Sequence, residues 1–96
     1  MANHLTPLEV CEALIGRREH IGDLLGIDPK SPYQWRHERG ARAAGDLPYV
    51  SYLRRLLTHS TTYQLGLELE HLIFGASRAE IDEILKTRRP RMEAAE

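Results

Sequence analysis

The chain has 96 residues, of which 42% are hydrophobic and 28% charged, and its formal net charge is −1. This length allows one compact domain, and the composition excludes a disordered or fibrous chain. Because Cys11 is the only cysteine, an intramolecular disulfide and a zinc site built from several thiolates are excluded. The sequence has no apolar run near the ~18 residues of a membrane span, and residues 1–10 do not resemble a secretory signal. We therefore expect a soluble, cytoplasmic protein with no cofactor, no metal and no membrane partner.

The charges are distributed unevenly along the chain. From Arg17 to Arg55 there are eight Arg or Lys residues against five Asp or Glu, whereas from Thr61 to Leu85 one basic residue faces five acids. A binding partner feels the local potential rather than the total charge. The first stretch is therefore suited to an anionic partner in spite of the net negative charge.

Helix start and stop patterns divide the first third of the chain. Thr6-Pro7-Leu8-Glu9 reads as a capping box with proline in the first helical turn, and Gly16 is a suitable stop. A second helix is expected at roughly Arg17 to Leu25, closed by Gly26, which tolerates the left-handed conformation. These patterns predict two short helices in succession.

A turn and a third helix are expected after Gly26. Asp28-Pro29 is typical of a turn, and Ser31-Pro32 is a suitable cap and start for a helix that continues through Arg36. Two helices joined in this way form the layout of a helix-turn-helix over Arg18 to His37.

From about Leu14 to Leu57 the sequence resembles the Cro and repressor-type helix-turn-helix regulators of phages and bacteria, a lambda-repressor-like family. In IGDLLGIDPKSPYQWRHERG, the resemblance implies a small contact residue at Gly22, a turn at Gly26, a buried residue at Ile27 and a core residue at Trp35. A further helix is implied from Gly45-Asp46-Leu47-Pro48 to Leu57 beneath the third helix. Its two apolar stripes are Val50, Leu53 and Leu57, and Tyr49, Tyr52 and Leu56.

The expected architecture is an all-α, five-helix compact domain. Residues 1–60 would form the helix-turn-helix core, residues 61–88 two further helices that pack on it, and residues 89–96 a flexible tail. The resemblance implies a transcription regulator, expected to be a repressor, that docks its third helix in the major groove of double-stranded operator DNA.

The resemblance also implies which side chains contact DNA. Gln34 is the leading base-reading residue, since glutamine pairs bidentately with adenine. The expected base contacts are Lys30, Tyr33, Gln34 and His37. The expected phosphate contacts are Arg17, Arg18, Ser31, Arg36, Arg39 and Arg42, of which Arg39 and Arg42 would lie in a flexible loop. Tyr33 suits the core and the DNA surface equally well.

Pro32 departs from the family pattern, which has an aliphatic or β-branched residue inside the recognition helix. A proline inside a helix removes a backbone donor. If the helix begins at Pro32 with Ser31 as its cap, that penalty vanishes, and residues 28–31 become an extended segment leading into it. The third helix is then shifted or short.

The C-terminal third fits two kinds of secondary structure, because residues 63–74 fit a strand by alternation and a helix by three- and four-residue spacing. We favour a helix, since no partner strand is evident. Ser77-Arg78-Ala79-Glu80 is a second capping box that starts the last helix, and Pro90 should limit it. The basic residues near its end suit a solvated tail better than phosphate contacts. They are Lys86, Arg88, Arg89 and Arg91.

A homodimer is expected because one such module covers about half of an operator. The candidate interface is Leu67, Leu69, Leu72, Phe74, Ile81 and Ile84. The same residues fit equally well into the core of a single chain, so both interpretations stay open.

No catalytic motif is present in the sequence, so we do not expect an enzyme. Glu68-x-x-His71 places a carboxylate and an imidazole on one helical face, but a metal site of that kind needs further acids. The alternative to DNA binding is an adaptor, a degenerate helix-turn-helix that binds RNA polymerase or another phage or host protein. Pro32 and the acidic C-terminal half motivate this alternative.

Overall fold

Six helices and two very short strands make up the part of the chain described by the computed structural model, namely the backbone of residues 3–95 and the side chains of residues 3–88. The helices are α1 Pro7–Leu14, α2 Arg18–Leu25, α3 Ser31–Gln34, α4 Val50–Tyr63, α5 Leu69–Phe74 and α6 Arg78–Ala95, and the strands are β1 His4–Leu5 and β2 Ala76–Ser77. The expected helical domain is confirmed in its class. The expected count of five helices is wrong by one. The two strands are not predicted from the sequence, because two residues are too few to show the alternation of apolar and polar side chains that marks a strand.

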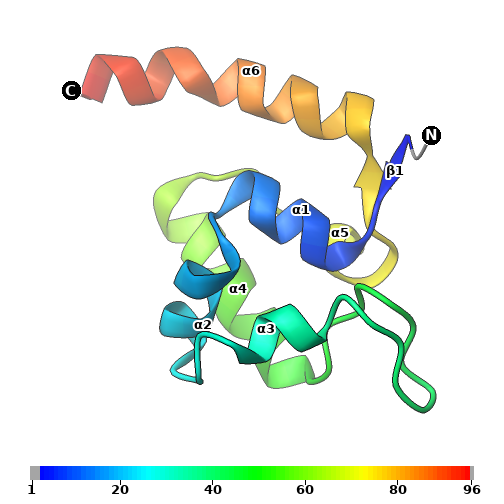
Figure 1. Cartoon of the computed structure of the whole chain (residues 1–96). Helices are drawn as coiled ribbons and strands as arrows, with labels where there is room; N and C mark the ends of the chain where they lie inside the picture. Colours follow the sequence, from blue (N-terminus) through cyan, green and yellow to red (C-terminus); the bar gives the residue numbers. More distant parts are fainter. Residues whose placement is uncertain (1–2, 96) are drawn as a thin grey trace.

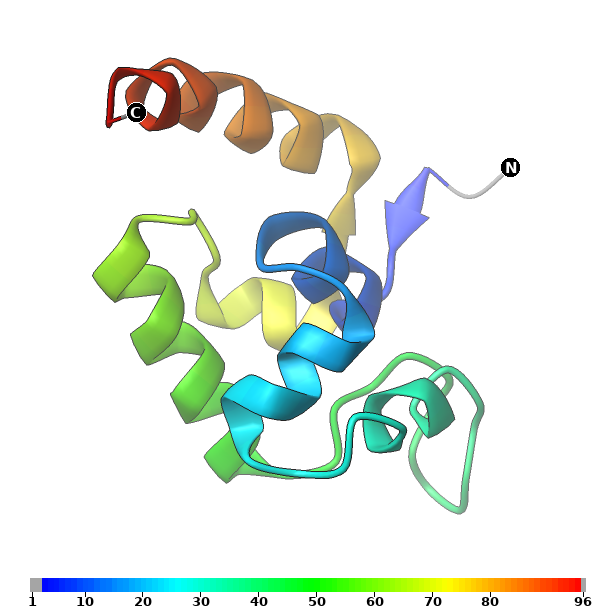
Figure 2. The ribbon, with the colours of Figure 1, turned by 60° about the vertical axis from the view of Figure 1, so that its left-hand side comes forward.

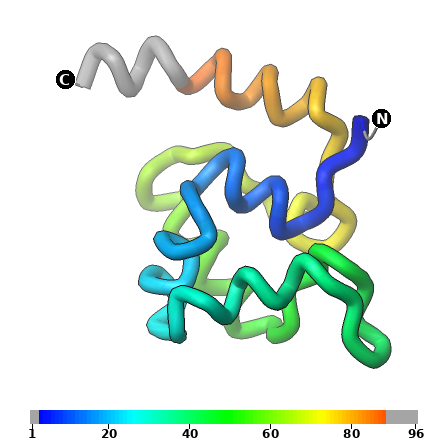
Figure 3. Tube along the Cα trace, in the orientation of Figure 1, coloured from blue at the N-terminus to red at the C-terminus, as the bar shows by residue number. Residues whose placement is uncertain are grey.

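Helix α1 lies at the centre of the molecule (Figures 1 and 2). It packs against α5 and α6 on one side and against α2 on the other, while α2 packs against both α3 and α4. The chain path in Figure 3 shows α6 and the α2–α3 segment on opposite sides of α1. Strands β1 and β2 pair antiparallel, with His4 opposite Ser77, and so join the N-terminus to the start of α6.

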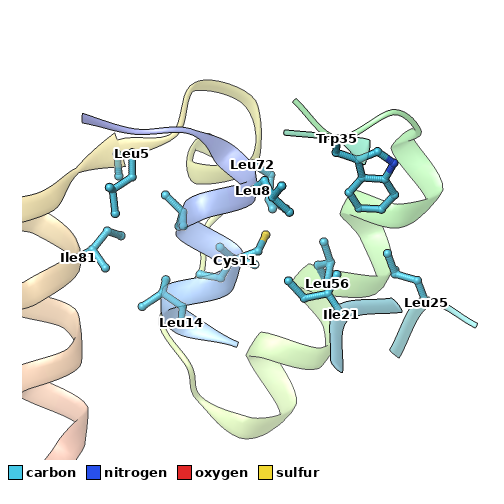
Figure 4. Close-up of a cluster of buried hydrophobic side chains, with 13 residues drawn as sticks. Leu5, Leu8, Cys11, Leu14, Ile21, Leu25, Trp35, Leu56, Leu72 and Ile81 are labelled. Atoms are coloured by element: carbon cyan, nitrogen blue, oxygen red, sulfur yellow. The ribbon is translucent and has the colours of Figure 1, made fainter. Parts of the chain in front are cut away.

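The hydrophobic core runs through α1 from one end of the domain to the other (Figure 4). Val10 and Cys11 are fully buried, with Ile81 of α6 at one end of the cluster and Trp35 at the other. Burial raises the pKa of the Cys11 thiol to about 12, so this cysteine is a small apolar core residue rather than a nucleophile. Burying each aliphatic side chain of this cluster contributes roughly 1.5–3 kcal/mol.

The first two helices begin and end as the sequence predicts. The Thr6 side chain accepts a hydrogen bond from the Glu9 N–H, and the Glu9 carboxylate accepts one from the Thr6 N–H, which completes the capping box. Helix α2 begins at Arg18 and ends at Leu25, and its C-terminal cap Gly26 has a left-handed φ of 73°. Both ends are set by local residues, which is why they were predictable.

The region from Leu57 to Phe74 differs from expectation. Helix α4 begins at Val50 and ends at Tyr63, well past Leu57, and its C-terminal cap Gln64 has a φ of 55°. The expected helix over residues 63–74 is correct for α5 and wrong for residues 64–68, which are not helical. The buried Ser60 hydroxyl accepts a hydrogen bond from the Leu67 N–H at 2.9 Å and so holds this segment on α4.

Helix α6 passes Pro90, so the expectation that Pro90 limits it is wrong. Proline removes one backbone hydrogen bond and bends a helix without ending it when good helix formers such as arginine, methionine, glutamate and alanine surround it. At the other end, the Ser77 hydroxyl accepts from the Glu80 N–H at 3.1 Å, as predicted. The side chains of residues 89–96 lie outside the described part, and with them the predicted tail contacts of Arg89 and Arg91.

Arg88 has a structural role that was not predicted. Its Nη1 donates to the carbonyl oxygens of Leu14, at the end of α1, and of Leu65, at 2.8 and 2.7 Å. Burial lowers the pKa of this guanidinium. Arg88 therefore belongs to the packing of α6 on the core, and the expectation of a solvated side chain at this position is wrong.

In the part of the chain that the structure describes, no helix has the length and apolar character needed to cross a membrane.

Candidate nucleic-acid interface

A close backbone contact sets the turn between α2 and α3. A Cβ atom at Gly22 would lie 2.9 Å from the Cα of Pro29, so only glycine fits without a shift of the backbone. The Asp28 carboxylate accepts a hydrogen bond from the Lys30 N–H at 2.8 Å, which closes a local turn. The turn at Asp28-Pro29 is therefore confirmed, and Gly22 packs against this turn.

Helix α3 is a single turn, Ser31–Gln34, as the position of Pro32 anticipated. Its cap is Lys30 rather than Ser31, and Lys30 has a right-handed helical conformation, so residues 28–31 form a turn and not the extended segment that we expected. Pro32 is buried at the second helical position, where a missing N–H costs nothing. Beyond Gln34 the backbone continues with bonds from Arg36 N–H to the Tyr33 oxygen and from His37 N–H to the Gln34 oxygen.

The aromatic residues of this segment take opposite roles. Trp35 is 6% exposed and its ring centroid lies 5.6 Å from that of Tyr52 in α4, so its predicted core role is confirmed. Tyr33 is 52% exposed, which decides the open alternative in favour of the surface. Burial of Trp35 turns the neighbouring side chains outward.

All four predicted base-reading side chains are exposed, and they line two neighbouring hollows. A shallow hollow between α2 and α3 is lined by Arg18, Glu19, Pro29, Lys30, Tyr33 and Gln34. A second hollow joins it through Tyr33 and Gln34. It is lined by Ile27, Ser31, Tyr33, Gln34, Trp35, His37, Glu38, Arg39, Arg42, Pro48, Tyr49 and Tyr52. The structure therefore places Lys30 at one hollow, His37 at the other, and Tyr33 and Gln34 at both.

Two arginines flank the exposed tyrosine of this surface. The guanidinium carbon of Arg18 lies 4.8 Å from the ring centroid of Tyr33, and that of Arg36 lies 5.9 Å from it. Arg17 is exposed, with only a weak ion pair to Glu19 at 3.7 Å. The cations predicted to contact phosphate thus stand beside the predicted base-reading residues.

The segment after α3 folds into a hairpin rather than an irregular loop. Arg39 and Arg42 exchange backbone hydrogen bonds of 2.9 and 3.0 Å around Gly40, whose φ is 59°. At the base of the hairpin the Gly45 oxygen accepts from the Leu8 N–H at 2.9 Å, which satisfies a free donor in the first turn of α1. The segment projects beyond α3 (Figure 2).

Arg42, a predicted phosphate contact, donates to backbone carbonyls in the structure. Its Nη1 lies 3.2 Å from the Trp35 oxygen and 3.4 Å from the Asp46 oxygen, and donates to both. This guanidinium closes the hairpin, so its assignment to a phosphate is corrected. Arg39 is exposed at the start of the hairpin, and its contact with a phosphate stays a prediction. Ser31 is half-buried at the start of α3.

The six residues of the predicted dimer interface fall into two groups. Leu67, Leu72 and Ile81 are buried within the single chain, so they belong to the core and present no surface to a partner. Leu69 and Phe74 of α5 are 51% and 71% exposed, and Ile84 is half-buried. Ile73, which the prediction omitted, is exposed beside them.

Glu68 and His71 are engaged in backbone and side-chain hydrogen bonds. The buried His71 accepts from the Glu68 N–H at Nδ1, 3.0 Å away, so its Nε2 carries the hydrogen and donates to the Glu80 carboxylate at 2.7 Å. These bonds join the start of α5 to α6. Across the described residues, no three His, Cys, Asp or Glu side chains gather closely enough to hold a metal ion.

The two arginines of the hairpin should separate stability from surface charge. We expect Arg42→Ala to lower the free energy of unfolding by about 1–2 kcal/mol, because two charge-assisted hydrogen bonds to backbone carbonyls are lost. Arg39→Ala removes the same charge from an exposed position and should change stability by less than about 0.5 kcal/mol. Urea denaturation followed by Trp35 fluorescence measures both, and equal losses would contradict the structural role of Arg42.

Comparison with known proteins returns no match to this chain among family models, curated proteins or solved structures. The functional conclusion below therefore depends on the residues and geometry of this surface, together with the sequence resemblance of residues 14–57.

Proposed function

We propose that this protein is a sequence-specific, double-stranded-DNA-binding transcription regulator of the lambda-repressor-like helix-turn-helix type. In this proposal α2, the turn at Asp28-Pro29 and α3 form the motif, and residues 1–60 form the DNA-binding core. The observation that carries the proposal is that four exposed, hydrogen-bonding side chains line two neighbouring hollows beside exposed arginines. The buried Trp35 anchors this surface to the core.

The chemistry of the surface suits the major groove. Gln34 has the amide that pairs bidentately with adenine, and Lys30 donates to the acceptors of guanine. Tyr33 and His37, whose ring centroids lie 6.4 Å apart, offer further donors and an apolar edge for a thymine methyl. Because α3 is a single turn, we assign base reading to this turn and the residues on either side of it.

The exposed cations suit the phosphates that border the groove. Arg17 and Arg18 stand at the N-terminus of α2, where free backbone N–H groups also favour an anion. Arg36 and Arg39 follow α3, and the half-buried Ser31 has a hydroxyl for a nearby phosphate. Such contacts supply affinity and orientation and carry no sequence information.

A second candidate function is a protein-binding adaptor, with RNA polymerase or another phage or host protein as its partner. The observation that favours it is the brevity of α3, which presents less helix to a groove than a full recognition helix. The exposed apolar residues of α5 offer a surface for such a partner.

Salt dependence distinguishes the two functions. If several arginines contact phosphates, affinity for a mixed-sequence duplex of about 20 base pairs should fall by roughly 10²-fold or more between 50 and 200 mM salt, because counterions are released on binding. Fluorescence anisotropy of a labelled duplex measures this. A chain that shows no salt-sensitive binding to DNA would favour the adaptor, whose apolar interface should barely respond to salt.

Gln34 and Arg18 should have different effects on DNA binding. We expect Gln34→Ala to change which duplexes are preferred in a selection from random sequences, since it removes a base contact. Arg18→Ala should weaken all duplexes to a similar degree, because it removes a phosphate contact. Loss of preference to the same extent in both variants would reject this division of roles.

We also propose that the regulator acts as a homodimer, through the exposed Leu69, Ile73 and Phe74 of α5. We expect sedimentation equilibrium at micromolar concentration to give the mass of two chains, and Phe74→Glu to give one, because a carboxylate in an apolar interface is costly to bury. Glu70→Gln on the same helix is the control, since it alters the charge of α5 without altering its apolar residues. A strict monomer for the unmodified chain would remove the dimer from the proposal.

A further inference from the structure

Arg18 is in contact with a carboxylate as well as with Tyr33. The Nε of Arg18 lies 3.5 Å from Oε2 of Glu12, which stands near the end of α1. Both side chains are 29% exposed, so each is largely covered while remaining within reach of solvent. Glu12 also lines a hollow together with Arg36, the second cation beside Tyr33.

The surroundings of the Glu12 carboxylate disfavour its charged form on balance. Burial raises the pKa of Glu12, and the neighbouring Arg18 and Arg36 oppose this shift without reversing it, while Glu9 and Glu19 add to it. The cost of burying this charge therefore exceeds what its cations return. Arg18 and Arg36 are the cations that oppose this cost, and the carboxylate lies where it occupies the guanidinium of Arg18.

We propose that Glu12 is a positioning residue that occupies Arg18 in the DNA-free protein and that a DNA phosphate replaces it as the partner of Arg18. This inference rests on the proposed function and adds its regulation: an internal carboxylate competes with the backbone of DNA for one guanidinium. Carboxylate and phosphate are the two anions that the guanidinium fork accepts in the same way.

The surroundings of Arg18 fit an exchange of anions in place. The Tyr33 ring supports its guanidinium from one side whichever anion is bound, so the side chain need not be rebuilt when its partner changes. The exposed part of Arg18 borders the hollow that also contains Lys30 and Gln34. A phosphate at the edge of that hollow approaches Arg18 from solvent, whereas Glu12 reaches it from α1.

A double-mutant cycle tests the exchange on the full chain with a mixed-sequence duplex of about 20 base pairs. Glu12→Gln keeps the shape of the side chain and removes the competing charge. We expect the affinity for the duplex at low salt to rise about two- to fivefold. The slope of log affinity against log salt concentration should steepen by up to about one. In an Arg18→Ala background the same substitution should have no effect, because the competition needs Arg18.

Glu83→Gln is the matched control. It removes the same charge from an exposed position on α6, which lies on the other side of α1 from α2 and α3 (Figure 1). An equal rise in affinity for Glu12→Gln and Glu83→Gln would show that only the net charge of the protein matters, and would overturn the proposal. A rise that persists in the Arg18→Ala background would overturn it as well. If neither the unmodified chain nor Glu12→Gln binds DNA, the proposed function fails and this inference fails with it, a result distinct from DNA binding that Glu12 does not affect.

A second measurement follows Arg18 itself. The side-chain Nε–H resonance of Arg18 in NMR spectra should differ between the unmodified chain and Glu12→Gln when DNA is absent, and should coincide when both are saturated with the duplex. Coincidence is expected because phosphate is then the partner in both. Resonances that still differ in the two complexes would show that Glu12 keeps Arg18 in the presence of DNA, and would overturn the exchange.

Discussion

The carbonyl oxygen of Trp35 is the point on which the proposed DNA surface depends. It accepts hydrogen bonds from the Gly45 N–H at 2.7 Å and from the Arg42 guanidinium at 3.2 Å, while the indole of the same residue is buried against α4. Gly45 in turn contacts Thr6 and Leu8 at the start of α1. A single residue thus connects α3, the hairpin and the core, and its burial leaves Tyr33, Gln34 and His37 facing solvent.

Arginine has two uses in this protein, and exposure separates them. Arg42 and Arg88 donate to backbone carbonyls and hold the hairpin and α6 in place, so their charge is used inside the structure. Arg17, Arg36 and Arg39 are exposed and remain available to an anion, whereas Arg18 lies between the two groups because Glu12 already contacts it. The number of arginines in the chain is therefore larger than the number that can meet a phosphate.

Parts of the candidate surface were predictable because they depend on neighbours in sequence. The shortness of α3 follows from Pro32 and its immediate neighbours. The core position of Trp35 and the small contact residue at Gly22 were expectations from the family resemblance, and Trp35 packs against Tyr52 in a different helix. The roles of Arg42 and Arg88 were not predictable, since a carbonyl acceptor can lie anywhere along the chain and leaves no trace in a pattern of side chains. The Leu14 acceptor of Arg88 is 74 positions away.

The sequence by itself determined where the first two helices begin and end, that the domain is helical, and that a turn precedes α3, because caps, glycines and prolines act over a few residues. Only the tertiary structure decided which apolar residues of the C-terminal third are core. Leu67 and Leu72 are buried whereas Leu69 and Phe74 are exposed, although all four are equally apolar. The physical reason is that burial depends on how α5 and α6 lie against α1, a relation that no short segment contains.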